Sequence, residues 1–370
     1  MPILPIANTR DVVTPALVLF RDKVEANIGR MLDIAGDASR LRPHSKTHKM
    51  ERVARLQLAR GIAKHKCATL AEAEMLAEAG ARDILLAYNP VGANVRRVVA
   101  FVARYPGVKF AVLADHAKPL DELGAMLSAA GRTVRVLLDL DTGQHRTGVA
   151  IGPAAMSLYA RIVETPGLEP GGLHVYDGHL RQADVGERAA AVREQWEAVR
   201  EFRDVLQSGG CPVPAVVAGG TPTFSAWAAI DDPAIECSPG TCVFFDAAYR
   251  EMCPDLPFEP AAMILTRVVS RPTEDTVTLD LGYKAIASDP PAGSRVVFPD
   301  LPDAEELKQN EEHLVIRTSR AAEFSPGDEL LAIPRHVCPG VPLHREALVV
   351  QNGRIIEAWP VTARDRKLTI

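Results

Sequence analysis

One short segment of the chain is rich in side chains that can do chemistry on a small molecule. Residues 42–49 read Arg-Pro-His-Ser-Lys-Thr-His-Lys, which places two histidines and two lysines within six positions. A lysine amine that is partly removed from water has a lowered pKa and can act as a nucleophile. A solvated basic loop would have the same composition, because most lysines lie at the surface. The segment is therefore a candidate site whose value depends on where the fold places it.

Two glycine-containing turns are candidates for binding an anion. They read Ala-Gly-Gly-Thr-Pro-Thr at 218–223 and Ser-Pro-Gly-Thr at 238–241. Glycine lets the backbone come close to a bound group, and consecutive backbone N–H groups can then surround an anion such as phosphate. A tight turn that needs glycine for a positive φ would give the same sequence. Both interpretations stay open at this point.

A histidine and a cysteine two residues apart could bind a metal ion. On an extended segment the side chains of His336 and Cys338 would point to the same face. Imidazole and thiolate suit Zn²⁺ better than Mg²⁺ or Ca²⁺, and two ligands leave the open coordination positions that a catalytic metal needs. The simpler interpretation is a buried cysteine beside a surface histidine.

The elements that must position these residues alternate in type from residue 41 to about 245. Short β-type runs are separated by stretches with the i, i+3, i+4 pattern of amphipathic helices. The expected strands are 41–45, 64–68, 83–87, 108–113, 134–138, 172–175, 215–218 and 235–243, and the expected helices include 70–79, 94–104, 119–130 and 187–206. Eight such units in roughly 200 residues predict an α/β fold, a (β/α)8 TIM barrel. Barrel active sites lie at the carboxyl ends of strands. The 42–49 segment, both turns and the polar residues 139–146 and 174–179 all fall there, although Asp and Gly are also common turn residues.

After about residue 250 the pattern changes to strands without helices between them. The expected strands are 262–269, 276–281, 313–317, 329–333 and 347–351, and residues 289–306 form the longest expected loop. Asn352-Gly353 before 354–359 predicts a two-residue hairpin. We therefore expect a barrel over residues 1–248 and a mostly antiparallel β domain over 249–370, with the N-terminal segment as a candidate part of the β domain.

The composition is that of an ordinary globular protein, with 47% hydrophobic and 24% charged residues, which excludes a disordered or fibrous chain. The net charge of −5 gives no electrostatic basis for binding nucleic acid or an anionic membrane. No apolar run approaches the roughly 18 residues of a spanning helix, and the N-terminus has no signal-peptide pattern. Six cysteines are too few for a disulfide scaffold, so we expect reduced thiols in a cytoplasmic protein.

Together these motifs resemble the fold-type III pyridoxal phosphate (PLP) enzymes, whose N-terminal barrel is alanine racemase-like, and within them the D-threonine aldolase and D-serine dehydratase-like family. The resemblance runs from Thr14 to the last strand, and its most specific motif is Arg-Pro-His-x-Lys-Thr-His-Lys at 42–49. It implies that Lys46 forms the Schiff base with the cofactor and that His336 and Cys338 bind a divalent metal, Zn²⁺, Mn²⁺ or Mg²⁺. The cofactor's phosphate and ring would contact Arg146, Tyr176, Gly219, Gly220, Thr221, Gly240 and Thr241.

The resemblance implies a PLP-dependent, metal-assisted lyase acting on a D-β-hydroxy amino acid. As an aldolase it would split D-threonine into glycine and acetaldehyde, with His44 or His179 as the base that takes the hydroxyl proton. As a dehydratase it would give a 2-oxo acid and ammonia, with Lys46 removing the Cα proton. The family also implies a head-to-tail homodimer and no partner beyond the small-molecule substrate.

Two positions and the domain count bear on the alternatives within this resemblance. Ser238 stands where racemases of this fold have an arginine before Pro-Gly, which disfavours a racemase. Cys338 matches the dehydratases, because the related aldolases typically have Asp there. The chain length and the Cys-Pro pair are common among sequences grouped with the D-threonine aldolases, so the choice between aldolase and dehydratase stays open. PLP homeostasis proteins consist of the barrel alone, and an enzyme for phosphorylated substrates without PLP would not need the Lys46 and His336 motifs.

Overall fold

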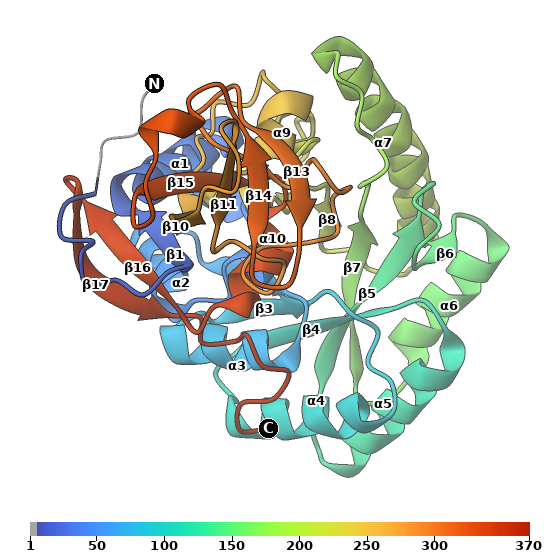
Figure 1. Ribbon diagram of the computed structural model, residues 1–370. Coiled ribbons are helices and arrows are strands. Elements are labelled where there is room, and N and C mark those ends of the chain that lie inside the picture. Colours follow the sequence, from blue (N-terminus) through green and yellow to red (C-terminus); the bar gives the residue numbers. More distant parts are fainter. Residues whose placement is uncertain (1–5) are drawn as a thin grey trace. The chain divides into compact units, whose positions relative to one another are not determined.

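The computed structural model describes residues 6–370, which divide into two compact units. The barrel unit comprises Met31–Lys46, Glu51–Gly240 and Asp365–Ile370, and the β unit comprises the chain up to Arg30, Thr47–Met50 and Thr241–Arg364. Each unit is built on a sheet of its own (Figure 1). Within the described residues, no helix combines the length and the apolar character needed to cross a membrane.

The barrel unit contains a curled parallel sheet with the strand order β2-β3-β4-β5-β7-β8-β9. Its strands are β2 (Lys64–Cys67), β3 (Asp83–Leu86), β4 (Lys109–Ala114), β5 (Val134–Asp141), β7 (Leu168–Val175), β8 (Val216–Ala218) and β9 (Ile235–Cys237), and the short β6 (Val149–Ala150) pairs with the end of β5. All neighbouring pairs are parallel, as the alternation of strands and helices predicts. The expected barrel is therefore confirmed.

The segment expected as the first strand, residues 41–45, does not form a regular strand but bridges the two edges of this sheet. Leu41 forms an isolated parallel bridge to Cys237 on β9, and His44 forms one to Lys66 on β2. Pro43 cannot donate a ladder hydrogen bond, and the 3₁₀ helix η2 (Ser45–Thr47) begins directly afterwards. Seven strands and this bridging segment thus close the ring.

Buried ion pairs anchor the bridging segment inside the ring. Arg42 is only 4% exposed, and its guanidinium bonds Glu236 at 2.5 Å and Asp83 at 2.8 Å. Glu236 also accepts from Lys64 at 2.6 Å. Because each of these charges has a partner, the segment is held on both sides without an unpaired buried charge.

Helices lie on the convex side of the parallel sheet (Figure 1). They are α2 (Glu51–Ala59), α3 (Leu70–Ala79), α4 (Ala93–Arg104), α5 (Ala117–Ala129), α6 (Pro153–Glu164), α7 (Val185–Ser208) and α8 (Phe224–Ala228). Helix α3 shows why the boundaries are readable: Thr69 accepts the N–H of Glu72 as the N-cap, and Gly80 ends the helix at φ 107°. An apolar cluster from four strands fills the ring: Leu85, Ala111, Leu113, Leu137 and Val217.

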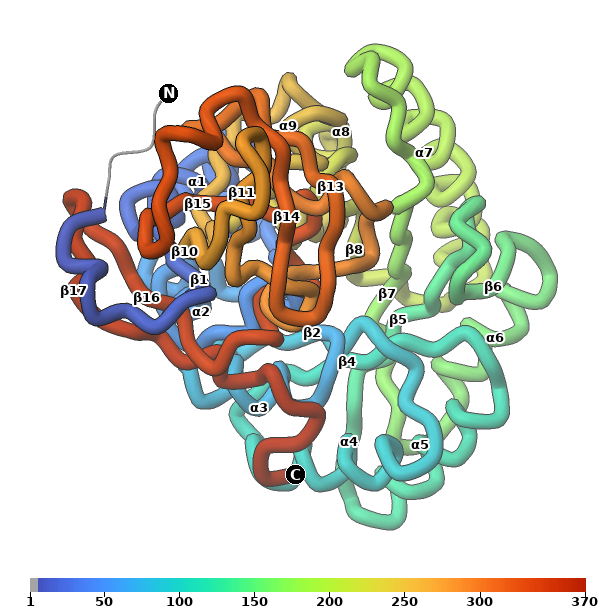
Figure 2. Tube along the Cα trace, viewed as in Figure 1, coloured from blue at the N-terminus to red at the C-terminus, as the bar shows by residue number. Residues whose placement is uncertain are grey.

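The β unit contains a mostly antiparallel sheet with the order β13-β14-β11-β10-β1-β16-β17, and β15 pairs with both β10 and β12. Its elements are β1 (Ala16–Phe20), β10 (Ala262–Ser270), β11 (Thr276–Leu279), β12 (Val296–Val297), β13 (Glu305–Gln309), β14 (Leu314–Arg317), β15 (Glu329–Pro334), β16 (Glu346–Gln351), β17 (Arg354–Pro360), α9 (Ala247–Met252) and α10 (Val337–Gly340). Helix α1 (Arg21–Ala35) follows β1 directly. Figure 2 shows the blue N-terminal strand β1 beside the red strand β16, and the pairing is parallel.

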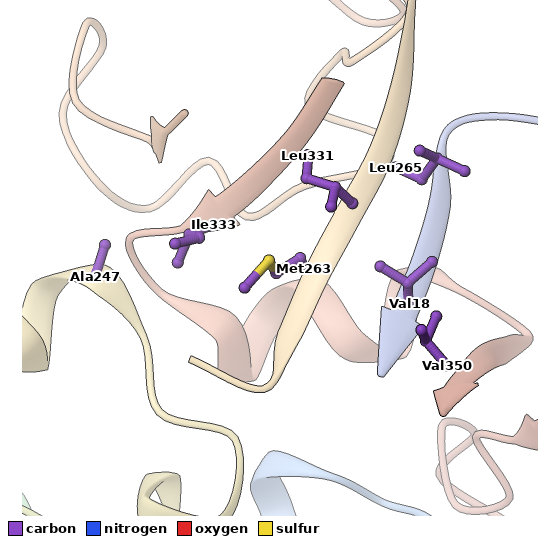
Figure 3. Packing of buried hydrophobic residues seen from close by; sticks show 7 residues of the cluster. All are labelled: Val18, Ala247, Met263, Leu265, Leu331, Ile333 and Val350. Atoms are coloured by element: carbon purple, nitrogen blue, oxygen red, sulfur yellow. The ribbon is translucent and has the colours of Figure 1, made fainter. Parts of the chain in front are cut away.

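The core of the β unit joins segments from both ends of the chain. Figure 3 shows its cluster, which consists of Val18, Ala247, Met263, Leu265, Leu331, Ile333 and Val350. The expected hairpin is confirmed: Asn352 and Gly353 have φ values of 50° and 70° between β16 and β17. The short strand β12 lies within the expected long loop 289–306, and β13 begins at the end of that loop.

Candidate active site

The candidate residues of the barrel unit gather at one end of the ring. Because its strands are parallel, the residues that follow β5, β7, β8 and β9 all leave from the carboxyl edge. Lys46 follows the bridging segment at that same edge, since His44 pairs with Lys66 near the end of β2. The fold therefore brings the lysine, the polar segments and the glycine turns of this unit to one mouth.

The ring of Tyr176 lies close to two cationic side chains of this mouth. The Lys46 Nζ is 5.9 Å from the ring centroid, and the Arg146 guanidinium carbon is 4.5 Å from it. Cations at these distances are attracted by the face of an aromatic ring. Gly178 keeps the ring accessible on another side, because a Cβ there would lie 2.5 Å from the Tyr176 hydroxyl oxygen. Lysine, guanidinium and phenol thus form one cluster.

The Gly219–Gly220–Thr221 turn is fixed by contacts that only glycine allows at its first position. Gly219 has φ 79°, and a Cβ there would lie 2.6 Å from Cδ1 of Trp227. The N–H of Gly220 donates to Thr223 Oγ1 at 3.1 Å. The second turn joins the first, because the Gly240 N–H donates to the hydroxyl of Thr221 at 3.4 Å.

Asp177 fixes the first turn through hydrogen bonds of its side chain. The sequence pattern did not indicate this role. Its buried carboxylate accepts from Thr223 Oγ1 at 2.9 Å and from Trp227 Nε1 at 2.7 Å. Burial raises the pKa of Asp177, and the two donors oppose that rise. Asp177 lies 46 residues from Thr223 in the chain, so only the folded ring brings them together.

A chain of buried polar side chains runs inside the ring. Lys66 Nζ lies 3.4 Å from His174 Nε2, and His174 Nδ1 lies 2.6 Å from a carboxylate oxygen of Asp139. The other oxygen of Asp139 accepts from Thr147 at 2.8 Å. Burial and, next in size, repulsion by the Lys46 ammonium lower the pKa of Lys66 to about 7. Lys66 was not among the residues that the sequence indicated.

The two histidines predicted as bases lie in different surroundings. The Nδ1 of His44 accepts the backbone N–H of Lys46 at 3.2 Å, so this nitrogen holds the start of the 3₁₀ turn. His179 is exposed, and its Nε2 would be 3.0 Å from a Cβ at position 143, where the chain has glycine. Of the two, His179 has the imidazole that solvent and a small ligand can reach.

In the β unit, His336 and Cys338 lie side by side at the start of α10. A hydrogen bond joins the two side chains, and the Nδ1 of His336 also lies 2.5 Å from Asp289 Oδ2. Burial would lower the pKa of His336, but the interactions with Cys338 and Asp289 raise it to about 9. Across residues 6–370, no group of three or more His, Cys, Asp or Glu side chains is arranged to hold a metal ion. The donor set is therefore a His–Cys pair with a carboxylate behind the imidazole, which suits a cation that keeps open positions.

The Cys338 thiol contacts two threonines, and each of them belongs to one of the other sequence motifs. Its sulfur is 3.2 Å from Thr47 Oγ1 and 3.4 Å from Thr241 Oγ1. Thr47 is the residue after Lys46, and Thr241 is the residue after Gly240. The side chain of Thr241, expected at the cofactor phosphate, thus contacts the candidate metal ligand.

Two family models match this chain. Residues 20–248 match "Alanine racemase, N-terminal domain", and residues 261–350 match "Putative serine dehydratase domain". A D-threonine aldolase from Arthrobacter sp. is 31% identical over 95% of this chain and 92% of its own length. The crystal structure of D-threonine aldolase from Filomicrobium marinum has a TM-score of 0.89 at 30% identity and covers 98% of both chains.

A dehydratase is also similar over most of the chain. D-threo-3-hydroxyaspartate dehydratase from Delftia sp. is 29% identical over 88% of this chain and 90% of its own length. A structure of a cysteine-to-alanine variant of D-threo-3-hydroxyaspartate dehydratase, described as metal-free, has a TM-score of 0.83 at 25% identity and covers 95% of this chain and 97% of its own. Lyases of two reaction types therefore share this architecture.

Proposed function

The chain belongs to the alanine racemase N-terminal domain family of fold-type III PLP enzymes and is a PLP-dependent lyase, and from this premise we propose that it is an aldolase for D-β-hydroxy amino acids such as D-threonine. The observation that carries the proposal is the cluster of Lys46, Tyr176 and Arg146 at the mouth of the ring. A lysine amine beside an aromatic ring and a guanidinium suits a small molecule with a carbonyl group and a flat ring.

The donor set of the barrel unit fits PLP. The Gly219–Gly220–Thr221 turn and Gly240 lie together, and Asp177 fixes the first turn through Thr223. Glycines at these positions let a bound group approach the backbone closely. We assign Lys46 to the bond with the cofactor, these turns and Thr241 to its phosphate, and Tyr176 and Arg146 to its ring. When bound, PLP supplies an electron sink for charge that develops at the substrate Cα.

The protein's own groups must bind the substrate and move one proton from its β-hydroxyl. We assign this base role to His179 rather than His44, because His44 uses its Nδ1 to accept the Lys46 N–H. An imidazole has the pKa range that suits a general base near neutral pH. Loss of the hydroxyl proton turns the Cβ–O bond into a carbonyl while the Cα–Cβ bond breaks and releases the aldehyde, and return of a proton to Cα then completes glycine.

A divalent cation is the second proposed requirement. His336 and Cys338 would hold it, and Asp289 would orient the imidazole. Bound there, the cation would supply Lewis acidity toward an oxygen ligand such as a hydroxyl. One structure of D-threo-3-hydroxyaspartate dehydratase, a cysteine-to-alanine variant, is described as the metal-free form, which is consistent with a metal in that enzyme. We propose Zn²⁺ first, because a thiolate–imidazole pair prefers it, and Mn²⁺ or Mg²⁺ next.

A dehydratase is the second candidate, and Cys338 is the observation that favours it. The dehydratase from Delftia sp. is nearly as similar to this chain as the aldolase from Arthrobacter sp.. In that reaction Lys46 would remove the Cα proton, the hydroxyl would leave from Cβ, and the products would be a 2-oxo acid and ammonia.

One product assay separates the two functions. The purified protein is incubated with D-threonine, PLP and Zn²⁺ or Mn²⁺, and acetaldehyde and 2-oxobutanoate are measured separately. The proposal expects acetaldehyde and glycine in equal amounts. 2-Oxobutanoate without acetaldehyde would replace it with the dehydratase. D-threo-3-hydroxyaspartate in a parallel reaction tests whether the chain prefers an acidic side chain.

We further propose that the enzyme acts as a homodimer in the cytoplasm, as the family resemblance and the sequence predict. Light scattering of the purified protein tests the first statement: a mass near twice 40.0 kDa supports it, and 40.0 kDa contradicts it. Cell fractionation tests the second.

A further inference from the structure

Lys66 is a buried amine of the barrel interior that the proposed reaction leaves without a role. It is 2% exposed, and its Nζ lies 3.4 Å from His174 Nε2. A lysine is rarely buried so completely unless it has a partner or a function. Here the nearest hydrogen-bonding partner is a neutral imidazole rather than a carboxylate, because Asp139 bonds the far nitrogen of that ring.

The backbone of Lys66 is tied to the segment that carries Lys46. Its N–H donates to the carbonyl of Pro43 at 2.9 Å, and its carbonyl accepts from Ser45 Oγ at 3.1 Å. Lys46 is the next residue after Ser45. The two lysines are therefore held by adjacent pieces of backbone, and the ammonium of Lys46 acts on Lys66 across a buried space.

Four charged groups, from the bridging segment, β5 and the segment after β7, act on Lys66. Lys46 and Arg42 on the bridging segment disfavour its charge, while Asp139 on β5 and Asp177 after β7 favour it. Burial disfavours the charge most, and the pKa of Lys66 falls to about 7. Lys66 is thus close to the balance between its charged and neutral forms near neutral pH. Among the nearby charges, the ammonium of Lys46 disfavours the charged form most.

We propose that Lys66 is a proton-linked positioning residue, which takes up a proton when PLP binds to Lys46. The inference rests on Lys46 as the cofactor lysine. Condensation of the Lys46 ammonium with the cofactor aldehyde would form a carbon–nitrogen double bond and release water, and the cofactor's phenolate would neutralise the positive charge left on the imine nitrogen. The cofactor's phosphate would add further negative charge, which favours a cation nearby. The proton comes from solvent, and Lys66 then supplies a fixed positive charge inside the ring.

The experiment measures the protons taken up when PLP binds. Calorimetric titrations of the cofactor-free protein with PLP at pH 7.5, in two buffers of different ionisation enthalpy without primary amines, give that number directly. Wild-type protein should take up roughly several tenths of a proton more per cofactor than Lys66→Met. An identical uptake by both proteins would overturn the proposal.

Matched variants keep the test decisive. Lys64→Met removes the same charge two residues earlier on β2, where the amine bonds Glu236 at 2.6 Å, and should leave the proton uptake at the wild-type value. Lys66→Gln removes the charge but keeps an N–H donor for His174, so it replaces Lys66→Met if that variant does not fold. Failure of the cofactor assignment has a different signature: Lys46→Ala would then keep the visible absorbance of the bound cofactor.

Discussion

The carboxylate of Asp289 is a single side chain whose effect can be measured apart from catalysis. It lies 2.5 Å from Nδ1 of His336, which leaves the other ring nitrogen for a metal. We expect Asp289→Asn to weaken Zn²⁺ binding about tenfold, the lower end of the usual range, because the pair is only partly buried. Competition with a chromogenic chelator measures it. Asp300→Asn, an exposed residue farther along the same stretch, is the control, and equal affinities in both variants would contradict the orienting role.

Asp177 should affect cofactor binding because it anchors a turn rather than touching the ligand. In Asp177→Asn the amide oxygen can accept from Trp227 Nε1, but the amide N–H₂ then faces the Thr223 hydroxyl, which already accepts from Gly220. We expect the dissociation constant for PLP to rise about tenfold, in line with a lost buried hydrogen bond of roughly 1–3 kcal/mol. Equilibrium dialysis measures it. Trp227→Phe removes only the other donor and should change the affinity less. The reverse order would argue against the anchoring role.

Residues with short-range signatures could be predicted from the sequence, and residues defined by long-range contacts could not. Lys46, His336 and Cys338 stand in compact motifs, so their types and spacing were sufficient to select them. Lys66 could not be selected, because its partner His174 lies 108 residues away. Asp289, 47 residues from His336, was expected only as part of a loop.

At the scale of elements, the turn after β8 contains a glycine position that should be sensitive to substitution. Gly219→Ala must adopt φ 79° and also place its Cβ 2.6 Å from Trp227. We expect a loss of about 3 kcal/mol in the free energy of unfolding, from backbone strain and overpacking together. Gly36→Ala, at φ 73° with nothing within 4 Å, should lose only about 1 kcal/mol. Chemical denaturation measures the free energy of unfolding of both variants. Equal losses would show that Trp227 moves away from the new Cβ at no energetic cost.

The elements that periodicity predicted well are those with one clearly apolar face or a clear terminal signal. Helix α3 begins and ends at the expected residues, because Thr69 and Gly80 cap it. Strand β13 was missed, since its sequence Glu-Glu-Leu-Lys-Gln is mostly polar and it lies at the edge of the sheet. The predicted strand 235–243 is too long, because β9 ends at Cys237 and a turn follows.

At the scale of the whole molecule, long-range contacts determine which segments of the chain belong to each unit. No local sequence pattern encodes these contacts. Strand β1 pairs with β10 and β16, whose residues lie about 245 and 330 positions later. A five-residue apolar run without a neighbouring turn signal does not indicate such partners. The grouping of the N-terminal residues with the β sheet therefore had to come from the folded chain, and the sequence offered it only as a candidate.

The free energy of unfolding of the whole chain should depend on the charge state of Lys66. Burial lowers its pKa from 10.5 to about 7, so between these values the unfolded chain holds a proton that the native chain lacks. The free energy of unfolding contributed by this group therefore rises with pH across that window, by at most about 1.4 kcal/mol per pH unit. Lys66→Met has no such group in either state. Urea unfolding of both cofactor-free proteins is measured at pH 7, 8 and 9. The free energy of unfolding of the wild type should rise relative to that of the variant with each increase in pH, because every other titrating group is common to the two chains. A constant difference would mean that Lys66 stays charged inside the ring, which would also remove the basis for proton uptake on cofactor binding.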